Sequence, residues 1–123
     1  MRFLTDRKRA VGMGSAKSGV EHFISMKISA VGLLILTPLF LLTFGPQLGE
    51  PYDEVLAHFA RPYPALITGL MIAVGFMHFK NGVQVLIEDY THGPMKDALI
   101  VGTICLSYAA ATAGIFAVAK LAL

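Results

Sequence analysis

Three long apolar segments alternate with shorter polar stretches along this sequence. They cover about residues 24–44, 65–87 and 98–118, and no charged residue lies between Asp97 and Lys120. Each segment is close to the ~20 residues that a helix needs to cross ~30 Å of hydrocarbon. Because lipid offers the backbone no hydrogen-bonding partners, each segment is expected to be helical. The pattern therefore predicts an all-α membrane protein with three transmembrane helices.

The composition supports this class. Hydrophobic residues make up 55% of the 123 residues and charged residues only 15%, more apolar surface than a soluble domain of this size can bury. A buried soluble helical bundle is the alternative, but the third segment is apolar on all sides. The single cysteine, Cys105, excludes an internal disulfide and a cysteine-rich metal site.

Charge is concentrated at the N-terminus. Residues 1–20 are expected to form an irregular basic arm, with Arg2, Arg7, Lys8, Arg9 and Lys17. The first loop, about residues 45–64, carries only Arg61 as a basic residue and contains a predicted short surface helix from Tyr52 to Phe59. The positive-inside rule then places the N-terminus on the cytoplasmic side, or on the matrix side in a mitochondrion. A membrane-surface arm is a simpler interpretation than nucleic-acid binding. Residues 21–123 are expected to form the three-helix anchor domain.

One histidine lies deep in the second segment. At ~100° per residue, His78, Gly82, Val85 and Asp89 fall on one face of the helix. His78 is about 13 residues from the outer end and about 11 from the inner end, so it lies near mid-membrane. An ionisable group at that depth is a candidate functional residue.

Two interpretations of His78 remain open, a hydrogen bond to another helix and an axial ligand of haem. Gly82, one turn further on, would leave room for a flat macrocycle. The other histidines, His22, His58 and His92, lie near or beyond the membrane edges. A haem with two histidine ligands would therefore need its second histidine from another chain.

Charged and aromatic residues occupy the ends of the helices. Lys27 lies about one turn inside the first helix, where it either extends toward the interface or pairs with an anion such as a haem propionate. Asp89 and Tyr90 end the second helix at the inner interface. They are either interfacial anchors or part of a quinone site, in which the tyrosine hydroxyl donates to a quinone carbonyl.

Three further polar residues, Lys80, Asn81 and Gln84, are unusual within a spanning helix. They are expected to face protein rather than lipid, which favours a partner subunit over a three-helix protein on its own. The odd number of helices also argues against a transporter built from two repeats.

The segment from His78 to Gly93 resembles the hydrophobic membrane anchor subunit of succinate dehydrogenase (complex II). The pattern is a histidine, a glycine four residues later, Gln-Val, and an Asp-Tyr pair, which here are His78, Gly82, Gln84-Val85 and Asp89-Tyr90. His92-Gly93 is similar to mitochondrial members. Residues 18–27 also resemble the family, which often has arginine where this chain has Lys27; lysine keeps the charge but lacks the bidentate fork. The resemblance covers about residues 18–120.

This resemblance implies a subunit that takes no part in succinate chemistry itself. It implies anchorage of a flavoprotein and an iron–sulfur subunit, beside a second, cytochrome b-type membrane subunit, in the bacterial inner membrane or the mitochondrial inner membrane. Electrons from succinate oxidation would pass to ubiquinone, linking the tricarboxylic acid cycle to the respiratory chain.

The residues implied by the resemblance form two groups. His78 would be one axial ligand, through the iron, of a haem b shared with the partner membrane subunit, with Gly82 and Lys27 beside the cofactor. Tyr90 and Asp89 would belong to the ubiquinone site. Two alternatives remain: the anchor of a fumarate reductase, and a membrane accessory subunit without redox function.

The basic arm and the three spans predict a topology that reporter fusions can test. Residues 45–64 should lie outside, whereas the arm and residues 88–97 should lie inside. A phosphatase fused after Gln47 should be active, and one fused after Lys96 should be inactive. A reporter at Gln47 that reads as cytoplasmic would overturn this topology.

Overall fold

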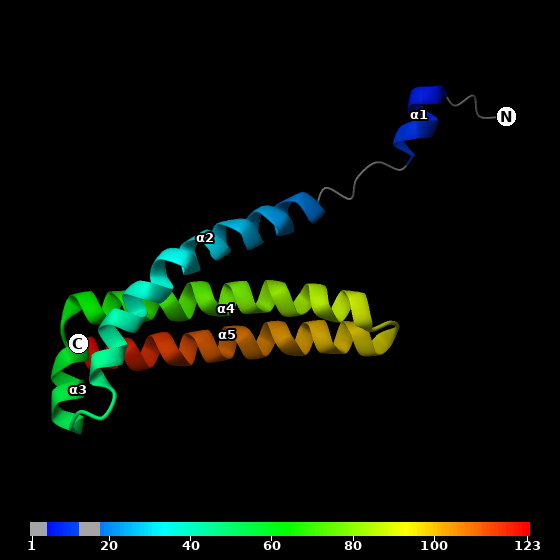
Figure 1. Ribbon diagram of the computed structural model, residues 1–123. Helices are drawn as coiled ribbons and strands as arrows, with labels where there is room; N and C mark the ends of the chain where they lie inside the picture. Colours follow the sequence, from blue (N-terminus) through cyan, green and yellow to red (C-terminus); the bar gives the residue numbers. More distant parts are fainter. Residues whose placement is uncertain (1–4, 13–17) are drawn as a thin grey trace.

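The computed structural model describes residues 5–12 and 18–123, and these residues contain helices and no β-strand (Figure 1). The helices, in chain order, are α1 (Asp6–Val11), α2 (Ser18–Phe44), the short 3-10 helix η1 (Gly45–Gln47), α3 (Tyr52–Phe59), α4 (Pro62–Tyr90) and α5 (Pro94–Ala122).

Three of these helices are long and apolar enough to cross a membrane, which confirms the predicted fold. Helix α2 has 27 residues, and α4 and α5 have 29 each, so each is about 40 Å long. Helices α4 and α5 extend beyond their apolar segments at both ends, and α2 extends beyond its segment at the N-terminal end. The sequence pattern marked only the part that matches the hydrocarbon, whereas the helical backbone continues through the polar ends.

Prolines and turns set where the long helices begin. Pro62 and Pro94 lie in the first turns of α4 and α5, where the missing N–H has no intrahelical partner to lose. Gly93 precedes α5 with a positive φ of 67°, a conformation that favours glycine. In contrast, α2 continues through Pro38 without a break in its helical assignment.

Helix α4 is the central helix, in contact with both α2 and α5. The short connection from Thr91 to Gly93 makes α4 and α5 antiparallel neighbours, and α2 crosses α4 at an angle (Figure 1). Glycines allow the close approaches. A Cβ added to Gly32 would lie 3.4 Å from Val74, and one added to Gly114 would lie 3.1 Å from Ile72. Small residues therefore set the helix spacing on both sides of α4.

The arm and the first loop each contain a short helix. Helix α3 confirms the predicted surface helix, and its buried Phe59 packs 6.3 Å from the ring of Phe44. The arm was expected to be irregular, but residues 6–11 form α1, because Thr5 accepts a hydrogen bond from the backbone N–H of Lys8 and caps the helix. Arg2 and Lys17 of the arm lie outside the described residues.

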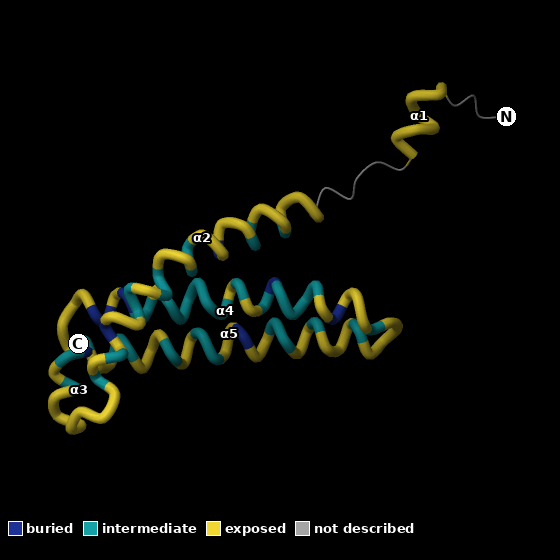
Figure 2. The backbone as a smooth tube through the Cα atoms, viewed as in Figure 1, coloured by how far each residue is buried: buried dark blue, intermediate teal, exposed yellow. Residues whose placement is uncertain are grey.

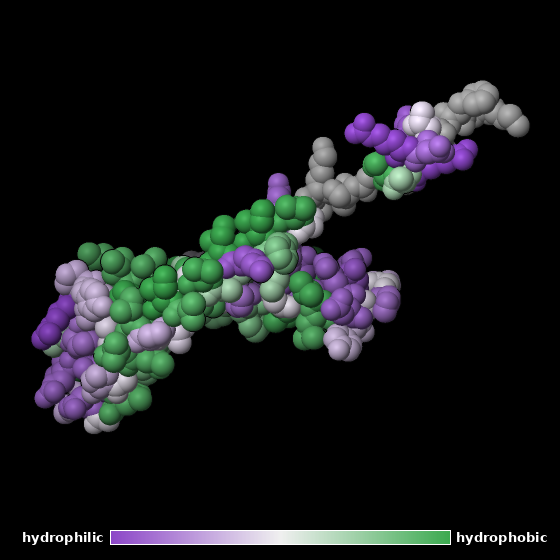
Figure 3. All heavy atoms as spheres, turned by 45° about the horizontal axis from the view of Figure 1, so that its top comes forward, coloured by the Kyte–Doolittle hydropathy of each residue, from purple (hydrophilic) through white to green (hydrophobic). Residues whose placement is uncertain are grey.

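Few residues of the three long helices are buried within the chain, and the others are half-buried or exposed (Figure 2). In the most apolar 18-residue stretch of each long helix, the share of residues buried within the chain is 11% for α2, 11% for α4 and 6% for α5. On the face seen in Figure 3, hydrophobic residues form a broad area between hydrophilic ends. This surface is far larger than the patches that soluble monomers expose, so it must be covered by lipid or by other subunits.

The contact at Gly114 predicts a specific packing defect. Gly114→Leu would push a side chain into Ile72 of α4, and overpacking of this kind costs about 1–3 kcal/mol. The purified protein should therefore denature at a lower temperature in mild detergent. Gly102→Leu is the matched control, because a Cβ there meets no atom within 4 Å. Equal effects of the two substitutions would contradict close packing at Gly114.

Candidate functional site

Two pairs of polar residues join α2 to α4 inside the apolar bundle. Ser25 and Ser29 lie one turn apart on α2, and His78 and Asn81 lie one turn apart on α4. The Oγ of Ser29 is 3.0 Å from the Nδ1 of His78, and the Nδ2 of Asn81 donates to the Oγ of Ser25 over 3.1 Å. We call these two contacts the polar ladder.

Two members of the polar ladder are buried, whereas Ser25 and His78 are half-buried. Ser29 is 1% exposed and Asn81 is 3% exposed. Buried polar groups need hydrogen-bonding partners, because an unsatisfied one costs about 1–3 kcal/mol. The ladder supplies these partners within the chain, and it fixes which face of α4 is turned toward α2.

His78 therefore makes the hydrogen bond across helices that the first interpretation predicted. Within residues 5–12 and 18–123, the protein partner of the imidazole is at Nδ1. A metal ligand would use the other ring nitrogen, Nε2, so the hydrogen bond and the ligand role are compatible. The ligand role remains a prediction.

A hollow of about 220 Å³ lies beside His78. Its walls are Phe23, Met26, Lys27 and Ala30 of α2 together with His78 of α4. The structure thus brings Lys27 and His78 to one site, although they are far apart in the sequence. The Nζ of Lys27 lies 5.1 Å from the centre of the Phe23 ring, a cation–π contact. The hollow combines an apolar wall, a cation and an imidazole.

The space one turn further along α4 is open. A Cβ added to Gly82 would meet no atom within 4 Å, so this chain leaves room on the side where the sequence predicted a flat group. The other histidines lie elsewhere: His22 near the start of α2, His58 in α3 and His92 in the α4–α5 connection. None of them is among the residues that line the hollow beside His78.

Asp89 and Tyr90 lie at the end of α4, about 16–18 Å along the helix axis from His78. Both are exposed, Tyr90 by 79%. Thr91 ends the helix, and its N–H and hydroxyl both donate to the carbonyl of Ile87. The last turn of α4 contains Glu88 and Asp89 but no basic residue. Because the C-terminal end of a helix is its negative end, helix stability does not explain these acids.

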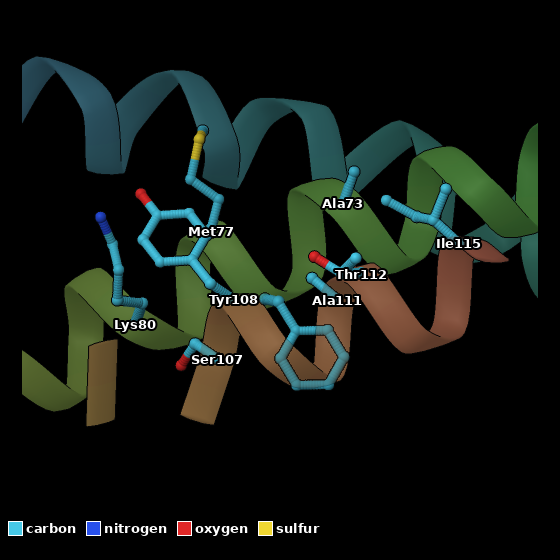
Figure 4. Close-up of a pocket in the computed structure, with 9 residues that line it drawn as sticks. Ala73, Met77, Lys80, Ser107, Tyr108, Ala111, Thr112 and Ile115 are labelled. Atoms are coloured by element: carbon cyan, nitrogen blue, oxygen red, sulfur yellow. The ribbon is translucent and has the colours of Figure 1, made fainter. Parts of the chain in front are cut away.

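The three polar residues expected to indicate a partner have contacts within the chain. Asn81 bonds to Ser25, and Gln84 donates to Glu88 over 3.0 Å. The Nζ of Lys80 lies 5.5 Å from the centre of the Tyr108 ring, in a hollow of about 270 Å³ between α4 and α5 (Figure 4). These three side chains therefore have contacts with α2, α4 and α5 of their own chain, and the partner subunit that they were taken to indicate stays a prediction.

Sequence reasoning missed Ser25 and Ser29. Their signal was present: two small hydroxyl residues four positions apart within an apolar segment, the spacing of one helix face. Small polar residues in transmembrane helices commonly mark contacts between helices. Within the described residues, no group of three or more His, Cys, Asp or Glu side chains gathers as a metal site would. Beside the hollow, the imidazole of His78 and the thioether of Met26 are the side-chain groups that can bind a metal.

The comparisons with known proteins agree with one another. Residues 1–118 match the family described as "Succinate dehydrogenase/Fumarate reductase transmembrane subunit". The chain is 41% identical over 123 residues to the succinate dehydrogenase hydrophobic membrane anchor subunit of Paracoccus denitrificans, covering 100% of this chain and 95% of the relative. It is 29% identical over 118 residues to the protein of the same description from Rickettsia bellii, covering 94% of each. No solved structure matches the chain significantly.

Proposed function

The chain belongs to the succinate dehydrogenase/fumarate reductase transmembrane subunit family as a membrane anchor subunit of succinate dehydrogenase, and we propose that it supplies one axial ligand of a haem b and part of the ubiquinone site. The observation that carries the proposal is the imidazole of His78, held through Nδ1 by Ser29 beside an apolar hollow that also contains Lys27.

The residues around His78 fit a haem. The Nε2 of His78 is the nitrogen suited to bind iron, Gly82 leaves open space beside α4, and Lys27 offers a cation for a propionate. When bound, a haem b supplies a one-electron carrier. A second ligand to the iron would come from a cytochrome b-type membrane subunit that faces α2 and α4.

The end of α4 supports the quinone site. The exposed Tyr90 hydroxyl can donate to a quinone carbonyl, and this bond strengthens as negative charge develops on the oxygen during reduction. The carboxylate of Asp89 can hold water for the two protons that quinone reduction requires. An acidic residue at the negative end of a helix is placed at a cost of about 0.3–1 kcal/mol, which a functional role would explain.

The remaining partners are those that the family resemblance implies. The flavoprotein and the iron–sulfur subunit would dock at the end of the bundle where α2 begins and α4 ends, so that electrons from succinate reach ubiquinone near Tyr90. The large exposed apolar surface supports contacts with the second membrane subunit and with lipid. The complex would lie in the bacterial inner membrane, or in the mitochondrial inner membrane of a eukaryote.

Fumarate reduction is the alternative direction, since the family description includes both enzymes. Both relatives are described as succinate dehydrogenase subunits, which favours succinate oxidation. Midpoint potentials of the purified complex distinguish the two directions, and a haem b absorption band would exclude an accessory subunit without redox function.

His78→Ala tests the haem assignment. Removing the imidazole should abolish or shift the low-spin haem b spectrum of the purified complex, because one of two axial ligands is lost. His92→Ala is the matched control and should leave the spectrum unchanged, since His92 is exposed in the α4–α5 connection. An unchanged two-histidine spectrum in His78→Ala would move the ligand to another chain.

Tyr90→Phe tests the quinone assignment by removing a single hydroxyl. A lost hydrogen bond of about 1–3 kcal/mol corresponds to a drop in quinone reduction of roughly 5- to 150-fold. Haem content and succinate oxidation with an artificial acceptor should be retained. Tyr63→Phe, near the opposite end of α4 and also exposed, should leave quinone turnover unchanged. Wild-type turnover and inhibitor sensitivity in Tyr90→Phe would reduce Tyr90 to an interfacial anchor.

A further inference from the structure

The hydroxyl of Ser29 has more acceptors near it than it can satisfy. Its Oγ lies 2.9 Å from the carbonyl oxygen of Ser25, 3.0 Å from that of Met26 and 3.0 Å from the Nδ1 of His78. A hydroxyl has one proton to donate but two lone pairs to accept with. The two carbonyls can only accept, so at most one of these three contacts is satisfied by the serine proton.

The direction of the His78 contact decides how many partners are satisfied. If Ser29 donates to a carbonyl of its own helix, the imidazole must carry its proton on Nδ1 and donate it to the serine oxygen. The serine–carbonyl contact and the His78–serine contact are then both hydrogen bonds, and the Nε2 of His78 keeps a free lone pair. If Ser29 instead donates to Nδ1, both carbonyl contacts lose their proton and Nε2 carries a hydrogen. The first arrangement makes two hydrogen bonds and the second makes only one, and this difference matters because Ser29 is only 1% exposed.

We propose that Ser29 is the positioning residue of the haem ligand: it accepts the Nδ1–H of His78, selects the tautomer whose Nε2 binds iron, and fixes the ring plane. This inference rests on the proposed function, because it assumes that His78 is the ligand. Ligating histidines generally donate their second nitrogen to such a partner, which also raises the basicity of the ligand. Here that partner is the hydroxyl of Ser29, which donates its own proton to a carbonyl of α2.

The second contact of the polar ladder supports the first. Ser25 accepts the Nδ2–H of Asn81 with its side chain and lies within hydrogen-bonding distance of the Ser29 hydroxyl through its carbonyl. The two contacts are therefore joined through one residue. Asn81 is three residues from His78 on the same helix face, so its bond restrains rotation of α4 and keeps Nδ1 within reach of Ser29.

The test compares hydroxyl removal at two buried sites of α2 in the complete complex. Ser29→Ala should lower haem affinity by about 10- to 100-fold. It should also move the haem midpoint potential to a more positive value, since a less basic ligand stabilises ferric iron less, and it should change the low-spin ferric signal in electron paramagnetic resonance. Succinate oxidation with an artificial acceptor should be unchanged.

Thr43→Val is the matched control. Thr43 is 8% exposed, and its Oγ1 lies 3.0 Å from the carbonyl oxygen of Leu39 and 2.9 Å from that of Phe40. Like the Ser29 hydroxyl, it can donate to one carbonyl of its own helix, but its hydrogen bonds include no histidine. Its loss should leave the potential and the spectrum unchanged. If Ser29→Ala does not assemble, Ser29→Cys keeps a side chain of similar shape with a weaker acceptor, and should give a smaller shift in the same direction.

Three outcomes distinguish the positioning role of Ser29 from the proposed haem-ligand role of His78. A shifted potential in Ser29→Ala with an unshifted Thr43→Val supports the positioning role. A wild-type potential and wild-type resonance signal in both Ser29 variants, while His78→Ala loses its ligand, overturns the role of Ser29 and leaves the proposed function intact. An unchanged haem spectrum in His78→Ala overturns both.

Discussion

The way in which α2 faces α4 depends on one polar contact in an apolar environment, the hydrogen bond between Ser29 and His78. Lipid and leucine side chains are similarly apolar, so hydrophobic burial alone does not choose how α2 and α4 face each other. Buried polar groups do choose, because each must find its partner. The contact fixes the rotation of α4, and this rotation places Lys27 beside His78 and turns Gly82 to open space.

Much of the fold could be predicted because each span is set by its own residues. Length and apolarity identified all three helices, and Tyr52–Phe59 could be identified from the turns around it. The ends of the helices were harder to predict from the sequence, because a helix continues through polar residues once the apolar part has formed. Helix α1 was missed because it depends on a local cap, in which Thr5 accepts from the backbone of Lys8, and not on periodicity.

Of the candidate site, the sequence predicted only those features that depend on the position of a single residue along its own helix. The depth of His78 and the position of Tyr90 follow from counting along one helix. The contact of His78 with Ser29 joins residues 49 positions apart, and no pattern within a single helix shows how two helices face each other. For the same reason, Asn81 was assigned to a contact with another chain, although Ser25 lies opposite it.

Helix geometry also explains how one element can serve two sites. At ~100° per residue, Asp89 lies only about 20° around the helix from His78, whereas Tyr90 is turned by about 120°. Asp89 therefore shares the face that α2 and the polar ladder fix, and Tyr90 points to an adjoining side. A contact that restrains rotation of α4 at Asn81 thereby sets the direction of both end residues. In this chain the orientation of the exposed end of α4 is determined by hydrogen bonds buried near its middle.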